Sequence, residues 1–91
     1  MSRITKGMHM AKQEKALNRL ATVPKDFTWS ELASLMKSLS YELQKAGGSG
    51  RKFVHTETRS TLFIHEPHPA KLLKPYQVRD VIHHLKKDGY L

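Results

Sequence analysis

A run of glycine and serine, Gly47-Gly48-Ser49-Gly50, constrains the fold of this sequence more than any other feature. Glycine tolerates the positive backbone φ angles that a tight hairpin loop needs. The side chains of residues 41–46, just before the run, are expected to point alternately to the two sides, which is the period of a β-strand. We therefore expect residues 41–46 and 51–55 to pair as strands. A third strand is expected at residues 61–65, which are rich in apolar and β-branched side chains.

Three helices are expected around these strands. Small apolar residues recur at helical spacing over residues 12–21, until a Val-Pro pair ends the pattern. Thr28 and Glu31 have the spacing of a capping box, which starts a second helix with an apolar stripe. Pro75 fits the first position of the last helix, and Gly89 is placed to end it. The order ααβββα, with helices on one face of the sheet, predicts an α+β fold.

The chain is short and basic. Its 91 residues suffice for one small domain, and we expect a flexible arm at residues 1–11 and the domain at residues 12–91. Sixteen basic and eight acidic side chains give a net charge of +8, which favours a polyanionic partner such as nucleic acid. Without cysteine or an apolar run long enough to span a membrane, the sequence predicts a cytoplasmic protein with no membrane partner.

Five of the six histidines lie in the second half of the chain. His65 and His68 bracket one tight turn, and side-chain alternation places Arg51 and His55 on one side of the neighbouring strand. An imidazole, with an ordinary pKa of about 6.5, can accept or donate a proton in catalysis. Cations stabilise the charge on a reacting phosphate. His68, His65 and His55 are therefore candidate proton-transferring groups, which would need no metal or other cofactor.

Structural roles fit the same residues. His65 could end a strand and bond a backbone carbonyl, and His68 could be a turn residue between two prolines. His83 and His84 are adjacent on the last helix, point about 100° apart, and are expected at the surface. The spacing of His65 and His68 is also compatible with zinc, but only Glu66 stands near as a further ligand, so we expect no metal site.

Cationic side chains are spread over the loops and strand ends of this region. Spaced cations can follow the phosphates across an RNA minor groove, so that shape is read more than sequence. The loop amides beside Ser49 could also contact a phosphate. The expected RNA-binding residues are Lys45, Ser49, Arg51, Lys52, Lys71 and Lys74.

Three landmarks in order along the chain give a family resemblance. They are the strand Tyr41-Glu42-Leu43 after an apolar helix, the pair Gly48-Ser49 followed by Phe53, and the turn His68-Pro69 leading to a helix through Tyr76, Val78 and Ile82. With these, residues 29–91 resemble the HicA family, the small toxins of bacterial type II toxin–antitoxin pairs.

The resemblance implies a fold like the double-stranded RNA-binding domain, mRNA cleavage without a metal ion, and silencing by an antitoxin of the HicB type. Members of the family usually carry a catalytic histidine directly after the Gly-Ser pair, where this sequence has Gly50. His68 belongs to a landmark of the family. Two other hypotheses remain open: a non-catalytic RNA-binding module of the same fold, and a protein-interaction module whose basic surface meets an acidic partner.

Overall fold

A computed structural model describes residues 13–91, so the arm expected at residues 1–11 lies outside the described part. A helix over residues 13–21 comes first. It is followed by α2 (Trp29–Ser38), β1 (Tyr41–Lys45), β2 (Gly50–His55), β3 (Thr61–His65) and α3 (Pro75–Lys87). The predicted order ααβββα is confirmed, and each strand begins and ends within one residue of its predicted bounds.

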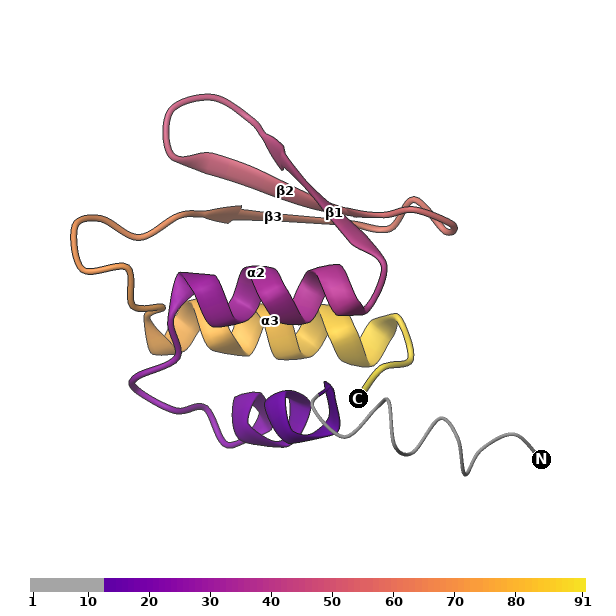
Figure 1. Ribbon diagram of the computed structural model, residues 1–91, viewed down its shortest axis with the longest axis horizontal. Helices are drawn as coiled ribbons and strands as arrows, with labels where there is room; N and C mark the ends of the chain where they lie inside the picture. Colours follow the sequence, from indigo (N-terminus) through magenta and orange to yellow (C-terminus); the bar gives the residue numbers. More distant parts are fainter. Residues whose placement is uncertain (1–12) are drawn as a thin grey trace.

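The strands form one antiparallel sheet in the order β1-β2-β3. Helices α2 and α3 lie under one face of this sheet, and the helix of residues 13–21 lies beyond them (Figure 1). No helix among residues 13–91 covers the other face, which we call the outer face. The register pairs Phe53 with Leu62 and Gly50 with His65. Because side chains alternate along a strand, Phe53 points to the helices and His65 to the outer face.

The core lies between the sheet and the two long helices. The rings of Trp29 and Phe53 are 5.6 Å apart between centroids, which joins α2 to the middle of β2. Burial of one large apolar side chain contributes about 1.5–3 kcal/mol, so these contacts dominate the stability of the domain. The buried apolar residues of α2 and α3 are Trp29, Leu32, Leu35, Met36, Val78, Val81 and Leu85.

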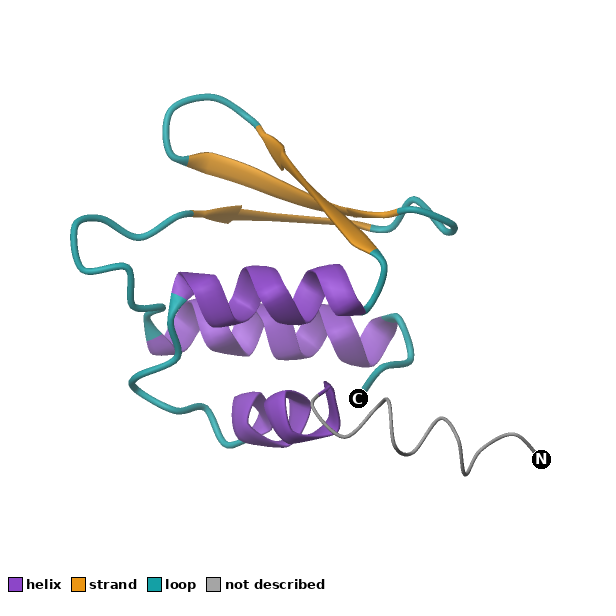
Figure 2. Cartoon of the chain, viewed as in Figure 1, coloured by secondary structure: helices purple, strands orange, loops and turns teal. Residues whose placement is uncertain are grey.

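The predicted helix and hairpin signals are present in the structure. The backbone N–H of Glu31 donates to Thr28 Oγ1 at 3.1 Å, and the N–H of Thr28 donates to Glu31 Oε1 at 2.9 Å. Gly47 and Gly48 adopt φ angles of +97° and +53° in the β1–β2 loop, which is one of the loops drawn in teal in Figure 2. After α3, Gly89 has a φ of +89°, which is a left-handed conformation typical of a helix end.

Candidate functional site

The hairpin end of the sheet brings the β1–β2 loop against the end of β3. Ser49 Oγ lies 3.2 Å from His65 Nδ1, and Gly50 is the direct partner of His65 in the sheet. The backbone N–H of Glu66 donates to the Ser49 carbonyl oxygen at 2.8 Å. His65 is exposed, and no described residue forms a hydrogen bond with its Nε2 atom. The contacts with the loop therefore orient this imidazole while one ring nitrogen faces solvent.

Glu66 connects strand β2 to the segment before α3 through two ion pairs, and its side chain is only 13% exposed. Its carboxylate lies 3.1 Å from Arg51 Nη2 and 3.0 Å from Lys71 Nζ. The hydrogen bond from Lys71, with the charges of Lys71, Arg51 and His68, lowers the pKa of the Glu66 carboxyl against the opposing effect of burial. His68 is exposed and lies on the same loop as Glu66. The structure thus brings His65 and His68 to the same end of the sheet.

The Arg51 guanidinium forms several contacts within the hairpin end. Its Nη1 donates to the carbonyl oxygens of Gly48 at 3.0 Å and of Gly50 at 2.8 Å, while its Nη2 meets Glu66. The guanidinium therefore links the hairpin to the loop that carries His68. Sequence reasoning considered Glu66 only as a metal ligand, because its pairing with Arg51 joins strands that are separated by a turn.

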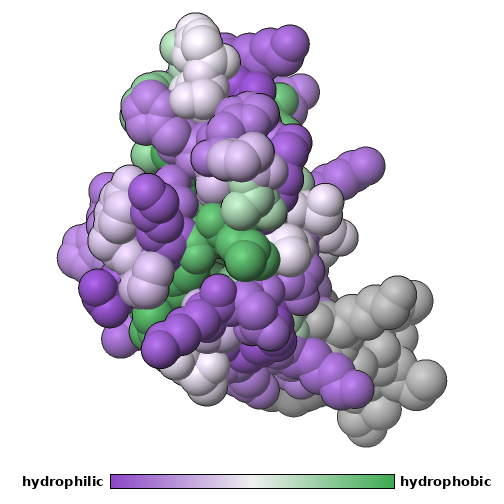
Figure 3. Space-filling view, turned by 90° about the vertical axis from the view of Figure 1, so that its left-hand side faces the viewer, coloured by the Kyte–Doolittle hydropathy of each residue, from purple (hydrophilic) through white to green (hydrophobic). Residues whose placement is uncertain are grey.

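The other predicted RNA-binding cations surround the same end. Lys45 is exposed and pairs with Arg51 in the sheet, and Lys52 lies on the outer face opposite Phe63. Lys71 and Lys74 are exposed in the segment before α3, where Lys71 binds Glu66. Figure 3 shows the side of the molecule on which the segment between β3 and α3 lies, and there hydrophilic side chains surround an apolar patch. The position of the cations is suitable for an anionic ligand.

His55, in contrast, lies at the far end of β2. Six residues of extended chain place it about 16 Å from the hairpin end. The ring is buried, with Nε2 2.7 Å from the Tyr90 hydroxyl and Nδ1 accepting from the backbone N–H groups of Glu57 and Thr58. Alternation correctly placed His55 and Arg51 on one face, but the structure does not bring His55 to His65 and His68. Both ring nitrogens serve the fold.

His84 is also buried, so the surface position expected for it is wrong. Its Nε2 lies 3.0 Å from Ser60 Oγ and 3.2 Å from Asp88 Oδ2, and Ser60 Oγ donates to Asp88 Oδ1 at 3.0 Å. Tyr41 donates to the same carboxylate. Ser60 and Asp88 both meet Nε2, whereas a nucleophilic triad uses the two opposite ring nitrogens. The network is therefore structural, and it ties α3 to the start of β1 and the end of the β2–β3 turn.

Burial of His84 predicts a pH dependence of stability. Desolvation, with the charges of Lys87 and His83, lowers the pKa of His84 in the folded protein, although Asp88 opposes this change. The unfolded chain therefore binds a proton near pH 6.5 that the folded chain resists. The melting temperature should fall between about pH 7.5 and 5.5, and His84→Gln should reduce this slope. His83→Gln, at an exposed position, removes only the smallest of these effects and should change the slope far less, whereas equal slopes for all three proteins would contradict the assignment.

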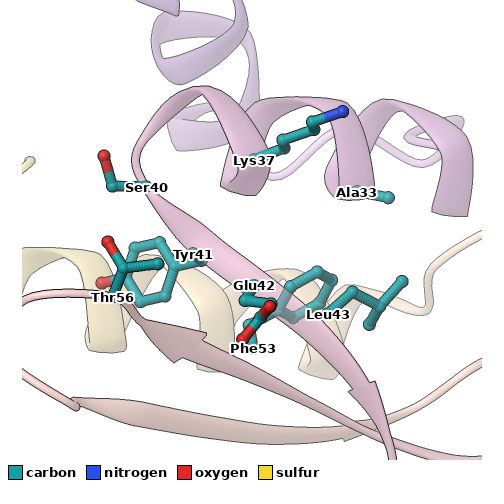
Figure 4. Close-up of a pocket in the computed structure, with 8 residues that line it drawn as sticks. All are labelled: Ala33, Lys37, Ser40, Tyr41, Glu42, Leu43, Phe53 and Thr56. Carbon is teal, nitrogen blue, oxygen red and sulfur yellow. The ribbon is translucent and has the colours of Figure 1, made fainter.

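A cleft of about 480 Å³ lies between α2 and β1 on the helix side of the sheet. Figure 4 shows its lining side chains, which are Ala33, Lys37, Ser40, Tyr41, Glu42, Leu43, Phe53 and Thr56. Leu43 remains 43% exposed there, because β1 diverges from the helices after Tyr41. No histidine lines this cleft, so it is not the candidate site for proton transfer, which lies with His65 and His68 at the hairpin end.

Among residues 13–91, no three histidine or acidic side chains converge in a way that could hold a metal ion. No helix in this part of the chain has the length and apolar character that a membrane span requires.

The topology and the paired loops at one end define a small α+β domain like the double-stranded RNA-binding domain. Comparison with known families agrees, because the sequence model of the HicA toxin of bacterial toxin-antitoxin pairs matches residues 29–90. The chain belongs to this toxin family. No curated protein and no solved structure matches the chain.

Proposed function

We propose that this protein is a toxin that cleaves mRNA in the cytoplasm, with His65 and His68 as the proton-transferring groups. The observation that carries the proposal is the exposed imidazole of His65, which Ser49 holds at the hairpin end of the sheet. Membership of the HicA family supports a toxin of a toxin–antitoxin pair. The family position of the catalytic histidine is Gly50 here, and His65 faces that position directly across the sheet.

The chemistry needs two proton transfers and a stabilised phosphate. One imidazole removes the proton from the ribose 2′-hydroxyl, whose oxygen then forms a bond to the adjacent phosphorus. The bond from phosphorus to the 5′-oxygen breaks, and the second imidazole donates a proton to that oxygen. The products are a 2′,3′-cyclic phosphate and a free 5′-hydroxyl. This route needs no cofactor, which agrees with the two imidazoles at the hairpin end.

Positive charge is the third requirement. Lys45 is an exposed cation at the hairpin end of the sheet, Lys74 is exposed just before α3, and the pair Arg51 and Lys71 exceeds the single charge of Glu66 by one. These groups can stabilise the additional negative charge on the phosphate in the transition state. The net charge of +8 also attracts the RNA backbone at long range.

The partner that silences the toxin is proposed to be a HicB-type antitoxin. The family match supports a toxin–antitoxin partner of this kind. A basic toxin surface favours a partner that presents acidic side chains, because complementary charge accelerates association.

Cleavage in the presence of EDTA tests the proposed function. The full chain, incubated with a single-stranded mRNA fragment and excess EDTA, should produce fragments that end in 2′,3′-cyclic phosphate and 5′-hydroxyl groups. Addition of a HicB-type antitoxin encoded beside the toxin gene should stop the reaction. Fragments that carry 5′-phosphates, or intact RNA at high protein excess, would contradict this mechanism.

A non-catalytic RNA-binding module is the second candidate, favoured by Gly50 at the family position of the histidine. RNA that is bound tightly in the same assay but stays intact would select this function. A domain that binds no RNA even at low salt, where phosphate contacts are strongest, would instead indicate a protein-interaction module.

A further inference from the structure

Phe63 is an aromatic side chain in the middle of β3 that points to the outer face and is 54% exposed. A single exposed apolar residue needs no explanation by itself. Its surroundings, however, are specific. Its ring lies 5.4 Å from the His65 ring between centroids, in an edge-to-face arrangement at 83°. Phe63 is therefore the immediate neighbour of the imidazole that is oriented by Ser49.

Gly50 provides the space for this ring. A Cβ atom at position 50 would come within 3.1 Å of Phe63 Cζ and 3.0 Å of the Gly47 carbonyl oxygen. Its φ angle is not positive, unlike those of Gly47 and Gly48, so backbone conformation does not require glycine there. The glycine instead allows Phe63 to lie across β2. The Cζ and Cε1 atoms of the ring lie over Gly50, and the side chain stays 54% exposed, so part of the ring is accessible to a ligand.

Polar groups that suit a nucleotide surround the ring. Lys52 is the direct cross-strand partner of Phe63, and Gln44 is the partner of Lys52 on β1. All three side chains share the outer face, as does His65. An aromatic ring flanked by a cation and an amide is the combination with which sheet surfaces hold the bases and phosphates of single strands.

We propose that Phe63 stacks one unpaired nucleobase of the RNA and thereby places the adjacent ribose at His65. The proposal rests on the proposed function and adds the substrate class, which is single-stranded RNA. Bases inside a duplex stack on their neighbours and expose only their edges, so a ring that stacks on a base face selects unpaired nucleotides. This differs from reading the shape of a duplex minor groove. The stacking itself tolerates every base, because each has a π face.

We call the exposed ring of Phe63 with its neighbours Lys52, Gln44 and His65 the platform. Binding measurements with RNA that lacks a free 2′-hydroxyl, the nucleophile of the cleavage step, test the platform separately from cleavage. The probe is a short, fluorescently labelled RNA with 2′-O-methyl riboses, used as a single strand and as a duplex. Phe63→Ala should weaken binding of the single strand by roughly tenfold to a hundredfold and leave duplex binding unchanged. Phe63→Trp should bind like the original protein, whereas Phe63→Leu, which is apolar but has no ring, should bind as weakly as the alanine variant.

Leu43→Ala is the matched control, because Leu43 is also exposed but lies on the helix side of the sheet. It should bind the single strand normally. Full binding by Phe63→Ala, rescue by leucine, an equal loss for the duplex, or no binding by the original protein would overturn the platform. If the original protein binds through Phe63 but cleaves no unmodified RNA, the platform stands and the cleavage proposal fails. Cleavage that continues without any effect of Phe63 on binding removes only the platform.

Discussion

His65→Ala should lower the rate of RNA cleavage by roughly 10²–10⁴-fold, the usual contribution of one general acid or base. The imidazole is exposed at the end of β3 and does not belong to the buried core, so its loss should leave the melting temperature nearly unchanged. The measurement is the initial cleavage rate of a single-stranded RNA under enzyme excess, with the melting temperature recorded for each variant. His68→Ala should show a loss of the same kind, because cleavage needs both an acid and a base.

His83→Ala is the control for the His65 variant. His83 is an exposed histidine on α3, on the helix side of the molecule, and it should contribute nothing to cleavage. Ser49→Ala should give an intermediate rate, since the hydroxyl orients the His65 ring through its contact at 3.2 Å and takes no proton itself. Full activity of His65→Ala, or equal losses for His65→Ala and His83→Ala, would show that the cleaving group lies elsewhere.

Local signals in the sequence were sufficient for the secondary structure. The capping box at Thr28, the glycine loop and Pro75 each depend on residues within a few positions of one another, and all three are present in the structure. Periodicity added the buried stripes of α2 and α3. These elements then allow few arrangements, because a three-stranded sheet with two long amphipathic helices has one face to cover.

The environments of the histidines depend on distant residues and could not be read in the same way. His55 is buried because Tyr90, 35 positions later, meets its Nε2. The buried ring of His84 contacts Ser60, 24 positions earlier, and Asp88, four positions later. Only Asp88 has the spacing of neighbours on a helix, whereas nothing in the sequence pattern indicates the contacts with Ser60 and Tyr90. His65 and His68 were easier to place together, since only two residues separate them.

Gly50 illustrates the same limit. In the sequence it is the last residue of a glycine-serine run, which predicts that it belongs to the hairpin loop. In the structure it begins β2, and a side chain there would meet the carbonyl oxygen of Gly47 and the ring of Phe63 on the neighbouring strand. A cross-strand register was needed to connect the two positions. The candidate site was thus predictable in its general location, while the outer-face platform required the sheet.

Asp88→Ala should destabilise the fold by about 3 kcal/mol, because it removes the acceptor shared by two buried groups and one half-buried group. The Asp88 carboxylate is only 12% exposed, and Tyr41, Ser60 and His84 all contact it. Burial raises the pKa of Asp88, but the hydrogen bonds from Tyr41 and Ser60 and the charge of His84 outweigh that effect and lower it. For a domain of this size the expected loss in melting temperature is roughly 12–24 °C, measurable by circular dichroism.

Asp80→Ala is the matched control, since Asp80 is exposed on the same helix and should change stability by less than about 0.5 kcal/mol. Asp88→Asn should lie between the two, because the amide keeps one acceptor oxygen. The network lies at the end of β2 that is remote from His65, so well below its melting temperature Asp88→Ala should still cleave RNA at the original rate. A variant that is as stable as the original protein would refute the structural role of Asp88. A stable variant that has lost cleavage would instead place the chemistry at the His84 end of the sheet, and not beside Ser49.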